Sequence, residues 1–67
     1  MAKIQLNGKK ITLNQKLSVF DLLKKYKLNT KKVAIELNGS IIAKINYKKK
    51  IIKNNDKLEI VHFIGGG

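Results

Sequence analysis

The chain has 67 residues, and its composition excludes several classes of protein. A chain this short forms one domain and buries only roughly 60% of its unfolded surface, so a deep catalytic cleft beside a core has no room. A hydrophobic fraction of 43% indicates a folded globule in spite of the net charge of +11. Without cysteine there is no disulfide, thiolate metal site or thiol nucleophile, and a single histidine gives no basis for a metal centre.

The apolar runs are too short to span a bilayer, and no signal segment opens the chain. We therefore expect a cytoplasmic protein without a membrane partner.

All 15 basic residues are lysine. Lysine, isoleucine and asparagine fill 32 of the 67 positions, a skew typical of an A/T-rich coding sequence. The lysines are spread along the chain, and the arginine that makes forked contacts to phosphate and guanine is missing. The composition favours a solvated basic surface over specific nucleic-acid binding.

The chain opens with a predicted β-hairpin. Residues 3–6 and 10–13 alternate polar and apolar side chains, as half-buried strands do. Asn7-Gly8 lies between them and is a strong hairpin signal, because a tight primed turn needs positive φ at both central residues. The side chains expected to face the core are Ile4, Leu6, Ile11 and Leu13.

An amphipathic helix follows, and the sequence marks its start at Ser18. The Ser18 hydroxyl can accept from the backbone N–H of Asp21 while Asp21 reaches back, which is an aspartate form of the capping box. Lysines follow in the last turn, where the helix dipole favours cations, and we expect the helix to end at residues 28–29. Its expected apolar stripe consists of Val19, Leu22, Leu23 and Tyr26.

Three further strands are predicted in the second half, at residues 33–37, 40–43 and 58–63. Asn38-Gly39 repeats the turn signal between the first two. The lysine-rich residues 44–57 carry no clear pattern. Their expected anchors in the core are Tyr47, Ile51 and Ile52.

This order of elements predicts an α+β fold. One helix lying across a mixed sheet of about five strands is the economical two-layer arrangement for a chain of this size. We expect the last strand to pair parallel with the first, and the helix to form the crossover between the hairpins.

The predicted last strand leads directly to Gly65-Gly66-Gly67. Glycine has no side chain to bury, so we expect residues 65–67 to be a flexible tail behind a domain of residues 1–64. A tail without Cβ atoms can pass through a channel that excludes other residues. Its carboxylate needs activation by another protein, since the chain has no phosphate-binding loop and no catalytic residues. The alternative is an inert chain end.

The early Asn-Gly hairpin, the helix at residues 18–26, the strand and turn at 35–39 and the ending at 56–67 together match a known pattern. The ending runs from an acidic turn through a strand to a diglycine, with no residue expected beyond it. The chain resembles the sulfur carrier proteins of thiamine biosynthesis, which have the ubiquitin-like β-grasp fold. The similarity covers essentially the whole chain and is weakest at residues 44–53.

This resemblance implies a sulfur carrier and not an enzyme. In that family a partner related to the ubiquitin-activating enzymes uses ATP to adenylate the C-terminal carboxylate, here that of Gly67, and the carrier itself binds no cofactor. The carboxylate becomes a thiocarboxylate with sulfur from a persulfide on another protein, and thiazole synthase uses that sulfur to build the thiazole ring. Gly65 and Gly66 correspond to the tail that threads into the activating enzyme.

The last strand also predicts a docking surface. If Leu58 and Ile60 face the core, alternation turns Val61 and Phe63 outward. Exposed apolar side chains beside a functional end are typical contact anchors, although Phe63 could instead fold back onto the sheet. The predicted partner-binding residues are Val61, Phe63 and Ile64.

Two other functions fit parts of the sequence. A sulfur carrier of the molybdopterin type ends in a similar diglycine, although that family tends to be longer. A ubiquitin-like interaction or RNA-binding module would use the lysines and leave the tail inert. Its affinity for nucleic acid would fall steeply as salt rises.

Overall fold

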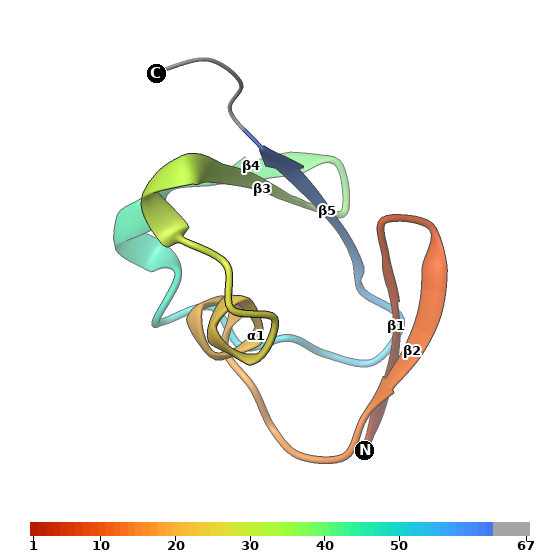
Figure 1. Ribbon diagram of the computed structural model, residues 1–67. Helices are drawn as coiled ribbons and strands as arrows, with labels where there is room; N and C mark the ends of the chain where they lie inside the picture. Colours follow the sequence, from red (N-terminus) through yellow and green to blue (C-terminus); the bar gives the residue numbers. More distant parts are fainter. Residues whose placement is uncertain (63–67) are drawn as a thin grey trace.

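Figure 1 shows the computed structural model, which describes residues 1–62. Within this range the five strands form one mixed sheet in the order β2-β1-β5-β3-β4, and α1 lies across one face of it. The predicted α+β architecture is confirmed. In chain order the elements are β1 (Ala2–Leu6), β2 (Lys9–Leu13), α1 (Val19–Lys25), a 3₁₀ helix η1 (Thr30–Lys32), β3 (Val33–Leu37), β4 (Ser40–Ile42), a 3₁₀ helix η2 (Lys44–Asn46) and β5 (Lys57–His62).

The last strand of the chain occupies the centre of the sheet. β5 pairs parallel with β1 at its beginning, and antiparallel with β3 along nearly its whole length. A parallel pair needs a long crossover connection, and here that connection contains α1 and the second hairpin. The predicted parallel pairing of first and last strands is confirmed.

Both Asn-Gly pairs form the tight turns that the sequence predicts. Asn7 and Gly8 have φ of 51° and 82°, and Asn38 and Gly39 have φ of 53° and 86°. Two consecutive positive φ values define a primed turn, whose twist matches that of the flanking strands. The turns therefore fix the registers of β1 with β2 and of β3 with β4.

The capping box at the start of α1 is also confirmed. The Ser18 hydroxyl accepts from the Asp21 N–H at 3.0 Å, and the Asp21 carboxylate accepts from the Ser18 N–H at 3.1 Å. The hydrogen bond that the Asp21 carboxylate accepts from the Ser18 backbone N–H, followed by the effect of the Ser18 side chain, holds the pKa of Asp21 below its ordinary value. Because the folded-state pKa is lowered, the contribution of this carboxylate to stability is present at neutral pH and is lost as pH falls through the folded-state pKa.

The helix ends earlier than residues 28–29, so its predicted end is wrong. α1 stops at Lys25, and Lys27 adopts the left-handed conformation with φ of 57°. The backbone N–H groups of Lys27 and Leu28 donate to carbonyls of the last helical turn at 3.0 and 2.9 Å, which is a Schellman ending on lysine in place of glycine. Tyr26 therefore leaves the apolar stripe and is 44% exposed, contrary to its predicted place in the core.

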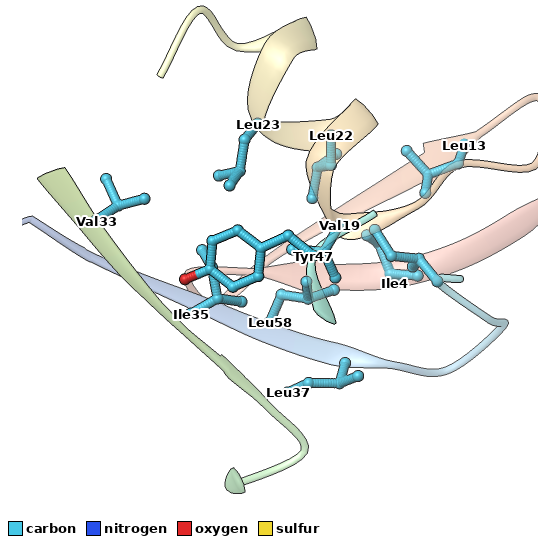
Figure 2. Packing of buried hydrophobic residues seen from close by; sticks show 11 residues of the cluster. Ile4, Leu13, Val19, Leu22, Leu23, Val33, Ile35, Leu37, Tyr47 and Leu58 are labelled. Atoms are coloured by element: carbon cyan, nitrogen blue, oxygen red, sulfur yellow. The ribbon is translucent and has the colours of Figure 1, made fainter. Parts of the chain in front are cut away.

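Figure 2 shows the core between the helix and the sheet. Leu22 and Leu23 point from α1 toward the sheet, and the ring of Tyr47 lies between them and the strand residues Ile35 and Leu58. The predicted core residues of the hairpin divide into two buried side chains, Ile4 and Leu13, and two half-buried ones, Leu6 and Ile11. The buried apolar set is Ile4, Leu13, Val19, Leu22, Leu23, Val33, Ile35, Leu37, Tyr47, Ile52 and Leu58.

The segment without a clear sequence pattern passes close to the helix before it returns to the sheet (Figure 1). Tyr47 and Ile52 anchor it in the core as predicted, and Ile51 is half-buried and forms a β-bridge with Ser18. Burial raises the pKa of the Tyr47 hydroxyl above its ordinary value. The segment is thus held by a few apolar anchors among exposed lysines.

Candidate functional site

The end of β5 is supported on one side more than on the other. Pairing with β1 stops at Leu6 and Leu58, whereas pairing with β3 continues to His62. Beyond Leu58 the strand runs past the end of β1, toward the side of the molecule opposite the N-terminus (Figure 1). The predicted tail follows from this part of the strand.

Asn7 takes over where β1 stops. Its backbone N–H donates to the Leu58 carbonyl at 2.9 Å, and its side-chain Oδ1 accepts from the Ile60 N–H at 2.7 Å. The side chain thereby replaces the next carbonyl that β1 would have offered. Asn7 thereby continues the hydrogen bonding along this edge of β5 as far as Ile60.

Asn38 holds the start of β5 from the other hairpin. Its N–H donates to the Lys57 carbonyl at 2.8 Å and its Oδ1 accepts from the Lys57 N–H at 2.9 Å. Its Nδ2 donates to Asp56 Oδ1 at 3.0 Å, and Asp56 Oδ2 accepts from the Lys53 N–H at 2.7 Å. The two turn asparagines therefore fix the first part of β5, at Lys57, Leu58 and Ile60.

Sequence reasoning predicted both asparagines as turn residues and missed their side-chain contacts with β5. Asn7 lies 53 positions from Ile60, whose N–H donates a hydrogen bond to the Asn7 side chain. The turn signal depends only on backbone conformation, and a glycine could have met it equally well. No local pattern shows that a turn residue also binds a remote strand.

Replacing Asn7 with glycine is expected to destabilise the protein by about 1 kcal/mol, because it keeps the positive φ and removes the acceptor for the Ile60 N–H. The matched control is Asn55→Gly, since Asn55 also has a positive φ, of 72°, and its side chain has no hydrogen bond within residues 1–62. Amide hydrogen exchange should accelerate at Ile60 in the first variant only. Equal protection of Ile60 in both variants would show that the Asn7 side chain does not hold the strand.

The predicted alternation of the last strand is confirmed from Leu58 to Val61. Leu58 is buried and Ile60 is half-buried, whereas Val61 is 49% exposed. His62 is exposed. The other predicted site residues, Phe63, Ile64, Gly65, Gly66 and Gly67, lie outside the described residues.

Residues 1–62 contain no group of three or more histidine, cysteine, aspartate or glutamate side chains that could hold a metal ion. Over the same range, none of the helices has the length and apolar character needed to cross a membrane.

The sequence model of the ThiS family matches residues 3–67. The chain belongs to the ThiS family. The sulfur carrier protein ThiS of Bacillus subtilis is 42% identical over 96% of this chain and 98% of that protein. The crystal structure of the thiamine biosynthesis protein ThiS from Geobacter metallireducens matches with a TM-score of 0.83 and 31% identity, covering 97% of this chain and 99% of that one.

Membership in the ThiS family identifies a small sulfur carrier of thiamine biosynthesis, and not an enzyme. The structural match confirms the β-grasp fold that the resemblance implies. A thiazole synthase of Paramagnetospirillum magneticum is also 38% identical over 97% of this chain. This chain corresponds to only 20% of the length of that protein.

Proposed function

We propose that the carboxylate of Gly67 is the sulfur-carrying group, and that Gly65 and Gly66 form the tail that delivers it to partner enzymes. The observation that carries this proposal is the position of β5. This strand lies at the centre of the sheet, is fixed by Asn7 and Asn38, and ends at His62, with only two residues between it and the glycines. A rigid strand followed by residues without side chains is suited to presenting a chain end.

The first proposed step is adenylation by a partner enzyme. A carboxylate oxygen of Gly67 attacks the α-phosphorus of ATP, the bond from that phosphorus to the β-phosphate bridging oxygen breaks, and pyrophosphate leaves. The product is an acyl adenylate whose leaving group is AMP. The partner enzyme binds ATP, and the carrier contributes the carboxylate.

The second proposed step introduces sulfur from a protein persulfide. The terminal persulfide sulfur attacks the acyl carbon and displaces AMP, which leaves the carrier joined to the donor through an acyl disulfide. A thiolate then attacks the donor-side sulfur of that disulfide. The S–S bond breaks, the thiol side is oxidised to a new disulfide, and the carrier leaves as the thiocarboxylate.

Thiazole synthase is the proposed acceptor of the sulfur. The relative in Paramagnetospirillum magneticum bears the name thiazole synthase and contains a segment similar to this chain. A second thiazole synthase, from Magnetococcus marinus, is 34% identical over 97% of this chain. A carrier-like segment within the same polypeptide as the synthase supports a functional pairing of the two.

Intact-mass spectrometry of the protein from its native cells tests the proposal. The expected result is a fraction of the protein whose mass is increased by the replacement of one oxygen with one sulfur, and fragmentation should place that change on Gly67. Incubation of the unmodified protein with ATP, the adenylating enzyme and the persulfide donor should produce the same species. Sulfur found on another residue, or none in cells that are making thiamine, would contradict the proposal.

A further inference from the structure

Within residues 1–62, no helix or loop covers the face of the sheet opposite α1 (Figure 1). Since Val33, Ile35 and Leu37 of β3 face the core, the residues between them face the other way. The strand registers place Ala34 beside Val61, and Glu36 beside both Ile41 and Glu59. We call these residues the open-face patch: Ala34, Glu36, Ile41, Glu59 and Val61.

The apolar members of the open-face patch are unusually exposed. Ile41 is 76% exposed and Val61 is 49% exposed, although both are β-branched side chains in paired strands. Exposed apolar surface next to polar residues on a sheet is typical of an interaction site. The folded chain gains little from leaving these two side chains in water.

The two acidic members of the open-face patch lower the stability of the isolated chain. Glu36 and Glu59 lie directly opposite each other on β3 and β5, and like charges in this position destabilise a sheet. Within residues 1–62 neither carboxylate has a hydrogen bond or an ion pair, although the chain has 15 lysines. The other two acids of the chain, Asp21 and Asp56, are both used in structural hydrogen bonds.

Lysine is gathered on the other half of the same face. Lys3 of β1, Lys10 of β2 and Lys57 of β5 line a shallow depression there, while Glu36 and Glu59 line a neighbouring one with Lys57 at its edge. The face is thus divided into a basic half and an acidic, apolar half. Although the protein has a net charge of +11, it presents an acidic pair on β3 and on β5, the strand that leads to its glycines.

We propose that the open-face patch is the docking surface for thiazole synthase, and that the surface it meets carries apolar side chains beside arginine or lysine. This inference rests on the proposed function. The partner surface should be basic, because arginine or lysine side chains would pair with the two carboxylates that have no partner within residues 1–62. We assign thiazole synthase as the partner for two reasons. Relatives of that name contain a segment similar to this chain. In addition, Val61 lies on β5, the strand that leads to the glycines from which the synthase would take the sulfur.

The test measures binding of the full chain to purified thiazole synthase from the same organism. Glu36→Lys with Glu59→Lys should weaken the affinity by about tenfold or more, and the remaining affinity should lose most of its dependence on salt. The matched control is Lys3→Glu with Lys10→Glu, which reverses two charges on the basic half of the same face. This control should bind within about twofold of the original protein.

A second variant separates binding from folding. Glu36→Gln with Glu59→Gln removes the like-charge pair, so its melting temperature should be unchanged or higher while its affinity falls. The inference would be overturned if the lysine variant bound thiazole synthase with the affinity of the original protein. It would also be overturned if the basic-half control lost as much affinity as the lysine variant, or if the original protein did not bind at all.

Mass spectrometry of the same variants distinguishes this inference from the proposed function. The lysine variant should still acquire the thiocarboxylate when the adenylating enzyme and sulfur donor are supplied in excess, since its residues 65–67 are unchanged. If the lysine variant loads sulfur and its affinity for thiazole synthase is unchanged, the docking surface is contradicted and the proposed function is not. Failure of the original protein to load sulfur contradicts the proposed function.

Discussion

One alanine appended after Gly67 is expected to abolish sulfur loading while the fold is kept. The addition moves the carboxylate away from the position at which the proposed adenylating enzyme would bind it, and it adds a Cβ to a tail that otherwise has none. Residues 1–62 form the sheet, the helix and the core without contribution from the added residue. The fold and the chemistry should therefore respond separately.

The measurement is intact mass after incubation with ATP, the adenylating enzyme and the persulfide donor, together with a thermal melt. The matched control carries the same alanine before Met1, which is 88% exposed. The control should load sulfur at the rate of the original protein, and both variants should melt at its temperature. Normal loading of the C-terminally extended variant would show that the carboxylate of Gly67 is not the reacting group.

Local signals predicted most of the fold. The Asn-Gly turns, the Ser18 capping box and the buried strand at residues 33–37 each depend on neighbours within a few positions, and each is present in the structure. The end of the helix was predicted too late because Lys27 takes the left-handed position that glycine usually fills. A lysine in that conformation carries no sequence signal, so Tyr26 was placed in the core by periodicity alone.

The candidate site could be predicted only where it depends on neighbouring residues of one strand. The exposure of Val61 follows from alternation along a single strand. The pairing of Glu36 with Glu59 depends on the register between two strands far apart in the sequence. Contacts across strands, including those of Asn7 and Asn38 with β5, needed the structure because their partners are set by topology.

Replacing Leu22 with alanine is expected to destabilise the protein by about 2–5 kcal/mol, because the side chain is fully buried between α1 and the sheet. Figure 2 shows Leu22 pointing from the helix toward the core residues of the strands. A chain of 67 residues has a total stability of roughly 3–10 kcal/mol on the usual scale per residue. The loss is therefore a large part of the whole, and the melting temperature should fall by about 10 °C or more.

Ile45→Ala provides the matched control, since it also truncates a large aliphatic side chain, but one that is 79% exposed on η2. Its effect should stay within about 0.5 kcal/mol in denaturant titrations. Sulfur loading of the Leu22 variant should fall in proportion to its unfolded fraction and recover on cooling to a temperature at which it is folded. Such recovery would show that the core only positions β5 for the chemistry. A drop of a few degrees or less would mean that the helix is not held to the sheet by this side chain, and that the strand leading to the glycines has another source of rigidity.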